Sequence, residues 1–514
     1  MNVVIVGNGM AGSRLVQELR ARDADMPITV IGAERGGPYN RVLLSHVLAG
    51  TAHADDIALA TPDWYARQSV TLRTGVRAVA IDRAARTVHT DDGEHTPYDA
   101  LVLATGSAAV LPDVAGVTGP SVTVFRTLDD CAAIVERART ATRVAVIGGG
   151  LLGLEAARGL AGRGLPVTVL HFAGHLMERQ LDAGAGSVLV RTLRRLGVDV
   201  ITDARTTEID PGGVRLGDGR RIEADLVVLA CGVRPDVELA RTAQITVDRG
   251  IVVDDHLRSV SDERIYAIGE CAQHDGQVYG LVAPGEQARV LADVLTGGAA
   301  TYGGTRTVTR LKAGGVELAA MGEAHLGEDD SDETELVTFV DAARDTYQKL
   351  VLREGRIVGA ILLGDTRAAG TVSQLFDRGA AAPGDRATLL LGARRGSEAE
   401  TPTRIPDAAT ICQCNGVTKR AIRDSWQAGA RSVADVADTT RATTGCGTCR
   451  ETVGGLLDWL AAADPQTVQS RQGGSASAPL AALGRIRGSA RAFGAAASRR
   501  RGSSRERSSP GGYR

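Results

Sequence analysis

The 514-residue chain is too long for a single hydrophobic core, so we expect several domains. A net charge of −2 argues against nucleic-acid binding, and the absence of a long apolar run argues against a membrane span. Three of the seven cysteines are scattered and four gather late, unlike a secreted disulfide framework. The apolar start also lacks the basic residues of a signal peptide, so we expect a cytoplasmic protein.

A dinucleotide-binding fingerprint opens the chain. An apolar strand pattern at 3–6 runs into the spacing G-x-G-x-x-G, and an amphipathic helix pattern follows. The glycines are Gly7, Gly9 and Gly12. They allow a tight turn, the approach of a pyrophosphate and close helix–strand packing, and the helix N-terminus favours the anion. A second strand pattern at 28–31 leads to Glu34, which is spaced to accept hydrogen bonds from an adenosine ribose.

Two segments after this fingerprint are further candidates for contact with a cofactor. Arg41 is the only cation in the turn and short helix pattern at 38–45. It either offsets phosphate charge or is an ordinary surface arginine, and the sequence leaves both open. The buried strand pattern at 101–103 ends in the small-residue turn Ala104, Thr105 and Gly106, where backbone can approach a bound group.

A second fingerprint repeats the same spacing after a strand pattern at 143–147. Its glycines are Gly148, Gly150 and Gly153. The next strand pattern, 166–170, ends at His171, where an NAD site usually carries an acid, so the preferred nucleotide remains open. Two complete fingerprints predict two dinucleotides, and the obvious pair is a flavin with a nicotinamide.

Two later strand ends complete a recognisable order of motifs. Gly232 to Pro235 follow the strand pattern at 225–230, and Gly269 and Glu270 follow the one at 264–268. With the motifs above, residues 1–390 resemble the two-dinucleotide FAD/NAD(P)H oxidoreductases of the ferredoxin-reductase and nitrite-reductase type. Glu270 stands where the wider family more often has Asp.

This resemblance implies an α/β fold with two Rossmann-like domains and a small α+β interface domain. The implied ranges are 1–110 with 242–300 for FAD, 111–241 for NAD(P)H and 301–395 for the interface domain. It also implies that Glu155 is the catalytic residue near the flavin–nicotinamide junction. The implied cofactor-binding residues are Gly7, Gly9, Gly12, Glu34, Arg41, Ala104, Thr105, Gly106, Gly148, Gly150, Gly153, Gly269 and Glu270.

Within 301–395 the residues read as mostly β. A Gly-containing turn at 353–355 between apolar runs predicts a hairpin over 349–363. The acidic stretch 328–335 is expected to be a solvated loop, with a docking patch for a basic partner as the alternative.

Four clustered cysteines indicate a metal or cluster site. Cys412 and Cys414 form C-x-C, Cys446 and Cys449 form C-x-x-C, and 415–445 between them reads as helical. Four thiolates suit either structural zinc or a two-iron cluster. The segment 408–463 resembles the small helical bacterioferritin-associated-ferredoxin-like [2Fe-2S] domain. The Gly-, Ser- and Arg-rich end, 464–514, is expected to be disordered.

The resemblance implies a flavoprotein of the nitrite reductase large-subunit or assimilatory nitrate reductase electron-transfer type. Such a protein would pass electrons from NAD(P)H through FAD and the cluster to a nitrate or nitrite reductase catalytic partner. No cysteine follows Cys449 for a second cluster, so we do not expect nitrite reduction by the chain itself. Disulfide-reductase chemistry is disfavoured, because the first cysteine is Cys131, a single one in a helix-like segment. Peroxidase and oxidase chemistry of the related group is disfavoured as well, because Ser45 and His46 stand where those enzymes carry a redox cysteine.

Two alternatives stay open at this point. One is a ferredoxin- or rubredoxin-type reductase with another acceptor, and the other is a non-catalytic redox-sensing or iron-handling adaptor. The terminal acceptor, the oligomeric state and the role of the tail cannot be predicted from the sequence.

Overall fold

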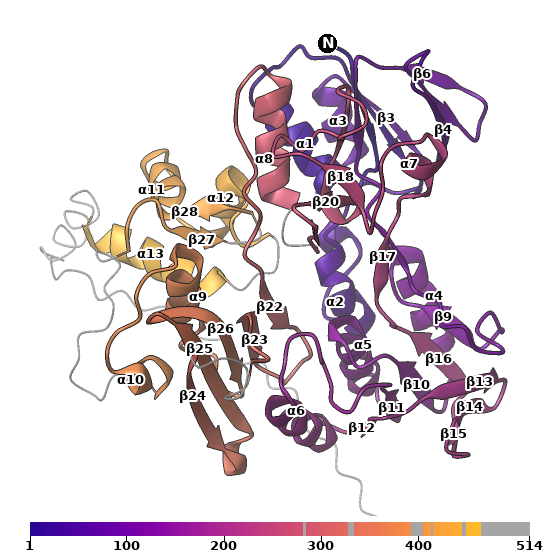
Figure 1. Ribbon diagram of the computed structural model, residues 1–514, viewed down its shortest axis with the longest axis vertical. Helices are drawn as coiled ribbons and strands as arrows, with labels where there is room; N and C mark the ends of the chain where they lie inside the picture. The colour runs from indigo at the N-terminus through magenta and orange to yellow at the C-terminus, as the bar shows by residue number, and fades with distance from the viewer. Residues whose placement is uncertain (281–283, 327–333, 392–404, 413–414, 445–448, 464–514) are drawn as a thin grey trace, which may run out of the picture. The chain divides into compact units, whose positions relative to one another are not determined.

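The structure is a computed structural model of the chain, shown in Figure 1. It describes residues 1–280, 284–326, 334–391, 405–412, 415–444 and 449–463. The tail, most of the acidic stretch 328–335, and the cysteines Cys414 and Cys446 therefore lie outside the described residues.

The first fingerprint lies in a five-stranded sheet whose paired strands are parallel, in the order β19-β7-β1-β2-β3. The strands are β1 (Val3–Val6), β2 (Ile28–Gly32), β3 (Val70–Thr74), β7 (Ala100–Leu103) and β19 (Ile265–Ala267). Helices α1 (Met10–Arg20) and α8 (Pro284–Leu295) pack against each other beside this sheet (Figure 1). The chain thus leaves this sheet after β7 and returns to it at β19, so two separate stretches of sequence build one core.

The second fingerprint lies in a sheet of the same kind, with strand order β12-β11-β10-β16-β9 and parallel pairing throughout. The strands are β9 (Val122–Val124), β10 (Val144–Ile147), β11 (Val167–Leu170), β12 (Val198–Ile201) and β16 (Leu226–Leu229). Its helices are α4 (Leu128–Ala138), α5 (Leu151–Gly162) and α6 (Ala183–Arg195). Strands β1, β7, β10 and β16 are buried at every position, as expected for parallel strands covered on both faces.

Short elements connect the two sheets and extend their edges. The chain passes between the two sheets through the antiparallel pair of β8 (Ser107–Ala109) and β17 (Val233–Pro235). The remaining strands are β4 (Ala78–Asp82), β5 (Thr87–Thr90), β6 (His95–Pro97), β13 (Thr206–Asp210), β14 (Gly213–Leu216), β15 (Arg221–Glu223), β18 (Ile251–Val253), β20 (Ala272–His274) and β21 (Gln277–Val278). The short helices are α2 (Leu44–Ala49), α3 (Pro62–Arg67), α7 (Glu238–Thr242) and the 3-10 turn η3 (Gly269–Cys271).

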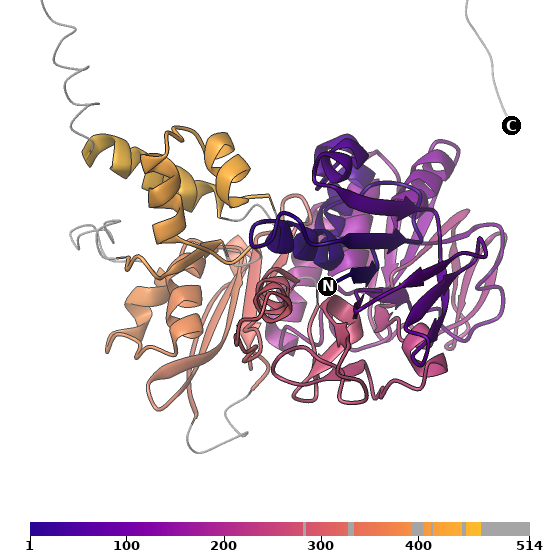
Figure 2. The same cartoon turned by 90° about the horizontal axis from the view of Figure 1, so that it is seen from above.

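A third, antiparallel sheet has the order β22-β23-β26-β25-β24 (Figure 2). Its strands are β22 (Val308–Leu311), β23 (Leu318–Gly322), β24 (Thr334–Asp341), β25 (Thr346–Arg353) and β26 (Arg356–Leu363). The predicted hairpin is confirmed, because β25 pairs with β26 across the turn Glu354–Gly355. Helix α9 (Ala369–Arg378) packs on β26, and α10 (Arg386–Leu391) follows.

The cysteine-bearing segment has its own small core. It contains the pair β27 (Thr410–Cys412) and β28 (Val417–Thr418), then α11 (Lys419–Gln427), α12 (Val433–Thr440) and α13 (Arg450–Ala463). The prediction of a helical stretch over 415–445 is therefore only partly right. β28 comes before the helices, and a capping box of Ser432 with Asp435 starts a separate helix after the turn at Gly429.

Among the described residues, no helix combines the length and the apolar character needed to cross a membrane.

Candidate functional site

The first fingerprint forms an open cradle. Gly7 has φ +117°, and a Cβ there would lie 2.1 Å from the carbonyl oxygen of Ala104. A Cβ at Gly12 would lie 2.0 Å from the carbonyl oxygen of Gly7, so the helix start packs directly on the strand end. At Gly9, by contrast, a Cβ would meet no described atom within 4 Å. The backbone is thus tight on its inner side and open on the side where a pyrophosphate would approach.

The second fingerprint has nearly the same geometry. A Cβ at Gly148 would lie 2.2 Å from the carbonyl oxygen of Ala230, and one at Gly153 would lie 2.0 Å from that of Gly148. Gly150 is as open as Gly9, with no described atom within 4 Å of an added Cβ. Two cradles of one design therefore end the central strands of two sheets.

Both fingerprint helices begin without a side-chain cap within the described residues. The neighbouring helices differ, since Thr127 caps α4 and Asp182 caps α6. The first-turn N–H groups of α1 and α5 therefore remain available, and the helix dipole favours an anion there. This geometry fits the diphosphate of a dinucleotide at each site.

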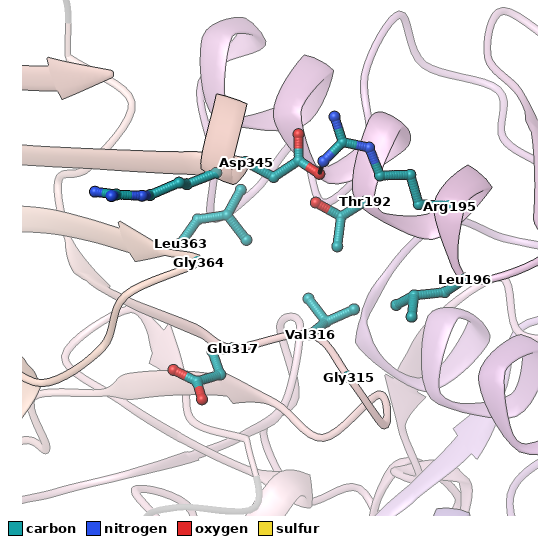
Figure 3. Close-up of a pocket in the computed structure, with 10 residues that line it drawn as sticks. Thr192, Arg195, Leu196, Gly315, Val316, Glu317, Asp345, Leu363 and Gly364 are labelled. Carbon is teal, nitrogen blue, oxygen red and sulfur yellow. Dashed lines mark hydrogen bonds and ion pairs between the residues drawn. The ribbon is translucent and has the colours of Figure 1, made fainter. Parts of the chain in front are cut away.

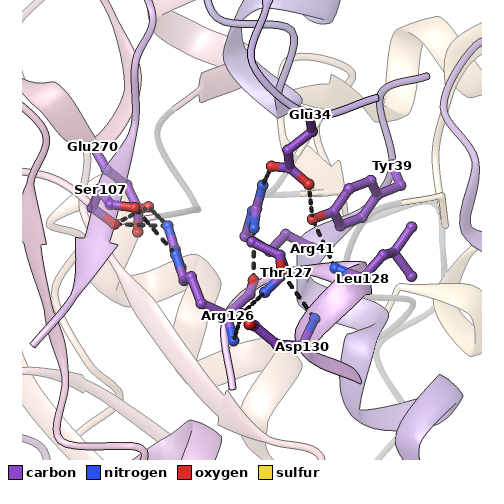
Figure 4. Close-up of polar contacts among 9 residues, drawn as sticks. All are labelled: Glu34, Tyr39, Arg41, Ser107, Arg126, Thr127, Leu128, Asp130 and Glu270. Atoms are coloured by element: carbon purple, nitrogen blue, oxygen red, sulfur yellow. Dashed lines mark hydrogen bonds and ion pairs between the residues drawn. The ribbon is translucent and has the colours of Figure 1, made fainter. Parts of the chain in front are cut away.

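Glu34, which follows β2, is held by two side chains (Figure 4). The Tyr39 hydroxyl donates to one carboxylate oxygen at 2.7 Å, and Arg41 Nη2 lies 2.5 Å from the other. Burial raises the pKa of Tyr39 well above its usual value, so this hydroxyl stays protonated and remains a donor. Arg41 also lies 4.9 Å from the Tyr39 ring centroid. Arg41 is therefore not a solvated surface arginine, and Tyr39 is a site residue that the sequence did not single out.

Glu270, on the 3-10 turn after β19, is held by a residue that no motif indicated (Figure 4). Arg126 Nη2 forms an ion pair with its carboxylate, and Ser107 Oγ donates to the same oxygen at 2.8 Å. Arg41 Nη1 donates to the carbonyl oxygen of Arg126 at 2.6 Å. A continuous line of contacts therefore joins Glu34 to Glu270 through the two arginines. The guanidinium groups place positive charge beside the first cradle, as a diphosphate requires.

The turn after β7 is hydrogen-bonded to the residue that follows β17. Thr105 Oγ1 donates to the carbonyl oxygen of Asp236 at 2.6 Å. Gly106 has φ +74°, and an added Cβ there would meet no described atom within 4 Å. In the turn after β19, the N–H of Gly269 donates to Gln287 Oε1 at 2.7 Å, and Gln287 is fully buried. Thr105 therefore fixes the turn through its hydroxyl and leaves the backbone at Gly106 open.

Glu155 lies on α5 at a meeting point of three parts of the chain. Its Oε1 accepts a hydrogen bond from the N–H of Lys312, which follows β22, at 3.1 Å. Lys312 Nζ in turn donates to the carbonyl oxygen of Val42, just before α2, at 3.3 Å. Glu155 is 8% exposed, and burial raises the pKa of its carboxyl, with Ser45 and Lys312 opposing that shift. His46, on α2, is half-buried, and burial lowers its pKa.

His171 is turned into the second cradle. It is 2% exposed, and its Nδ1 accepts a hydrogen bond from the N–H of Gly149 at 3.0 Å. Its Nε2 lies 3.0 Å from Glu178 Oε2, an ion-pair distance without the alignment of a full hydrogen bond. The imidazole therefore supports the glycine loop, an orientation that no sequence pattern indicates.

Two of the four expected cluster cysteines can be placed. Cys412 and Cys449 are buried in one small core with Trp426 and Val436. Because Cys414 and Cys446 lie outside the described residues, the described part contains no group of three metal-ligating side chains. The pairing of C-x-C with C-x-x-C stays a prediction.

The segment before Cys446 contacts helix α1 and the turn at Asn40. Asn40 Nδ2 donates to the carbonyl oxygen of Thr444 at 2.7 Å, and Arg441 Nη1 bonds to Gln17 Oε1 on α1. The loop leading to the second cysteine pair thus lies next to Arg41.

A pocket between α6 and the third sheet contains none of the expected site residues (Figure 3). An ion pair of 2.6 Å between Arg195 and Asp345 lies at its edge, and Val316 and Leu363 give it apolar walls. This pocket is separate from both cradles.

Two doubly wound sheets with open fingerprints define the class of two-dinucleotide oxidoreductases. The family model described as pyridine nucleotide-disulphide oxidoreductase matches residues 1–288, and the chain belongs to this family. The BFD-like [2Fe-2S] binding domain matches residues 410–459, and the rubredoxin NAD+ reductase C-terminal domain matches 308–380. The predicted fold class and the predicted set of FAD, NAD(P)H and [2Fe-2S] cofactors are confirmed by these families.

The relatives confirm the predicted resemblance. The chain is 39% identical over 471 residues to nitrite reductase [NAD(P)H] of Bacillus subtilis (strain 168), covering 90% of this chain and 58% of that protein. It is 37% identical to the assimilatory nitrate reductase electron transfer subunit of the same organism, covering 89% and 59%. The chain thus spans about three-fifths of the length of these relatives.

A solved structure has the same fold over most of its length. The ferredoxin reductase for the CYP199A2 system from Rhodopseudomonas palustris superposes with a TM-score of 0.67 at 28% identity. The match covers 74% of this chain and 95% of that one.

Proposed function

We propose that the chain is an electron-transfer flavoprotein of nitrogen assimilation. It passes electrons from NAD(P)H, through FAD and a [2Fe-2S] cluster, to the catalytic protein of a nitrate or nitrite reductase. The observation that carries this proposal is the contact of Asn40 with Thr444. It joins the loop two residues before Cys446 to the residue beside Arg41, whose guanidinium pairs with Glu34. The names of the two Bacillus subtilis relatives support the class of partner.

We assign FAD to the first cradle and NAD(P)H to the second. The FAD-binding domain then comprises 1–110 with 242–300, and the NAD(P)H-binding domain comprises 111–241. The interface domain is 301–395, and the cluster domain is 408–463. Glu34 would accept from the adenosine ribose of FAD, and Glu270 would accept from hydroxyls of the flavin's sugar chain. Arg41 and Arg126 would neutralise the diphosphate, each from a position already fixed by an acidic partner.

When bound, the flavin supplies the chemistry that converts a two-electron hydride donor into single electrons for a cluster. The residues of the chain bind and orient the cofactors and tune their electrostatic surroundings. Glu155 would place negative charge near the nicotinamide, where positive charge develops as hydride leaves. Its position depends on Lys312, which ties the third sheet to both α5 and the start of α2. Cys412, Cys414, Cys446 and Cys449 would ligate the cluster.

Reconstitution with a partner tests the proposal. NADH, the purified chain and the catalytic protein of an assimilatory nitrate reductase are combined without oxygen, and nitrate consumption is measured. A parallel reaction uses a nitrite reductase catalytic protein. One of the two substrates should be consumed only when all three components are present. If the chain oxidises NADH when ferricyanide is added but fails to reduce either catalytic protein, it is a reductase with another acceptor.

A further inference from the structure

The second cradle lacks an acid at the end of β11, but the structure brings a different carboxylate to that place. Glu178, seven residues after His171, lies with its Oε2 3.0 Å from His171 Nε2. We propose that Glu178 accepts the hydrogen bond of the adenosine 2′-hydroxyl and repels a 2′-phosphate, so that the chain prefers NADH over NADPH. This inference rests on the proposed function, because it takes the second cradle to be the nicotinamide-nucleotide site.

His171 cannot serve as the ribose acceptor itself. Its Nδ1 already accepts from the N–H of Gly149, and the ring is almost entirely buried. With Nδ1 acting as an acceptor, the proton of a neutral ring is on Nε2, which faces the Glu178 carboxylate. A side chain at Gly149 would collide with this ring, since an added Cβ would lie 2.7 Å from His171 Cγ. His171 therefore acts as a positioning residue between the glycine loop and Glu178.

The backbone around Glu178 is fixed beside the same loop. The N–H of Met177 donates to the carbonyl oxygen of Gly149 at 3.0 Å, and the Met177 side chain is buried. Glu178 thus comes directly after an anchored residue. Its side chain remains 29% exposed. An ionised carboxylate has acceptor sites to spare after one contact, so it can bind the imidazole and a ribose hydroxyl together.

The sign of the preference follows from charge. A carboxylate accepts well from a hydroxyl but repels a phosphate at the same position. A site built around a hydrogen bond to a substrate hydroxyl also discriminates more sharply than one that only fits its shape. The exposed Arg179 is the competing group, because a guanidinium at that point would favour the 2′-phosphate.

Binding of redox-inactive nucleotide fragments tests this proposal. Calorimetry with ADP-ribose and with 2′-phospho-ADP-ribose measures adenosine-site recognition without any electron transfer. The wild-type chain should bind ADP-ribose at least about tenfold more tightly. Glu178→Gln should bring the two affinities within about threefold of each other, since it removes the charge and keeps the size.

Two control variants separate charge at the site from general effects. Glu223→Gln removes an exposed carboxylate, paired with Arg143, from the same domain and should leave both affinities unchanged. Phe172→Ala removes an exposed neutral side chain, 72% exposed, that touches the His171 ring. Its ratio of affinities should equal that of the wild type, because no charge changes.

Each other outcome has a definite meaning. An unchanged ratio in Glu178→Gln would overturn the role of Glu178 while leaving nucleotide binding, and so the proposed function, in place. A wild-type preference for the 2′-phosphate would overturn it in favour of Arg179. Binding of neither fragment would overturn both this inference and the assignment of the second cradle.

Discussion

Arg126 and Glu270 lie 144 residues apart in the sequence and form an ion pair in which the side chains are only 11% and 10% exposed. The pair links the segment before α4 to the turn after β19, and it joins the two sheets next to the first cradle. Structural stability and charge at the proposed FAD site therefore depend on the same two residues.

Breaking this ion pair should destabilise the protein. In Arg126→Gln the Glu270 carboxylate stays largely buried, with Ser107 as its one remaining donor among the described residues, and we expect a loss of about 3 kcal/mol in the free energy of unfolding. The double variant Arg126→Gln with Glu270→Gln should recover most of that loss, because no unpaired charge remains. Urea unfolding of the apoprotein measures both. Additive losses in the double variant would show that the two residues are not coupled, and Arg139→Gln, in an exposed pair with Glu136, is the control.

Glu155→Gln tests the role of the buried carboxylate. The amide oxygen can still accept from the N–H of Lys312, so the local structure and FAD content should be kept. The negative charge is lost, and flavin reduction by NADH should slow by roughly tenfold, or about 1.4 kcal/mol. Stopped-flow absorbance at the flavin band measures the rate. A wild-type rate in this variant would reduce Glu155 to a purely structural link between α5 and the third sheet.

A pH effect is expected from Asp377 at the end of α9. Burial raises the pKa of Asp377 to about 6, and nearby Arg306 only partly opposes this. The folded state therefore holds the proton more tightly than the unfolded chain. The stability this contributes is present at low pH and is lost as pH rises from about 4 to about 6.

Asp377→Asn should remove the cost of the charged form. At pH 7.5 we expect the variant to be more stable than the wild type by about 2 kcal/mol, with the difference disappearing near about pH 4. Urea titrations at both pH values measure it. Glu354→Gln, in the exposed turn between β25 and β26, controls for loss of one negative charge from the same region. A gain that is equal at both pH values would contradict the assignment to Asp377 ionisation.

Cys446→Ser tests the order of the electron path. If the cluster lies between flavin and partner, NADH should still bleach the flavin at nearly the wild-type rate, while electron transfer to the catalytic protein should stop. Ferricyanide should still be reduced, since a small acceptor can take electrons from the flavin directly. Unimpaired reduction of the catalytic protein would place the cluster outside the path.

The parts of the fold that could be predicted are those written in local patterns. Strand, glycines and helix at Gly7 to Gly12 are contiguous, and so is the hairpin around Gly355, because each depends on neighbouring residues. Both fingerprints and the hairpin were found for this reason. The helical reading of 415–445 was only partly right, since β28 pairs with a strand on the other side of Cys414.

The contacts that hold the site together could not be predicted in the same way. Arg126 lies in a loop without a motif, and its partner Glu270 becomes a neighbour only once two sheets are assembled. Lys312 reaches Glu155 from 157 residues away. The direction of the His171 ring is likewise set by its hydrogen bond with Gly149, and a hydrophobic pattern in the sequence does not indicate such a contact.

We infer that one chain carries electrons from NADH through a flavin to an iron–sulfur cluster. An oxygen-free titration of the purified chain with NADH tests it most directly, with flavin absorbance and the paramagnetic signal of the reduced cluster followed together. We expect about one FAD and two irons per chain, and uptake of about three electrons, two by the flavin and one by the cluster. Bleaching of the flavin with no cluster signal, or stoichiometric zinc in place of iron, would contradict it.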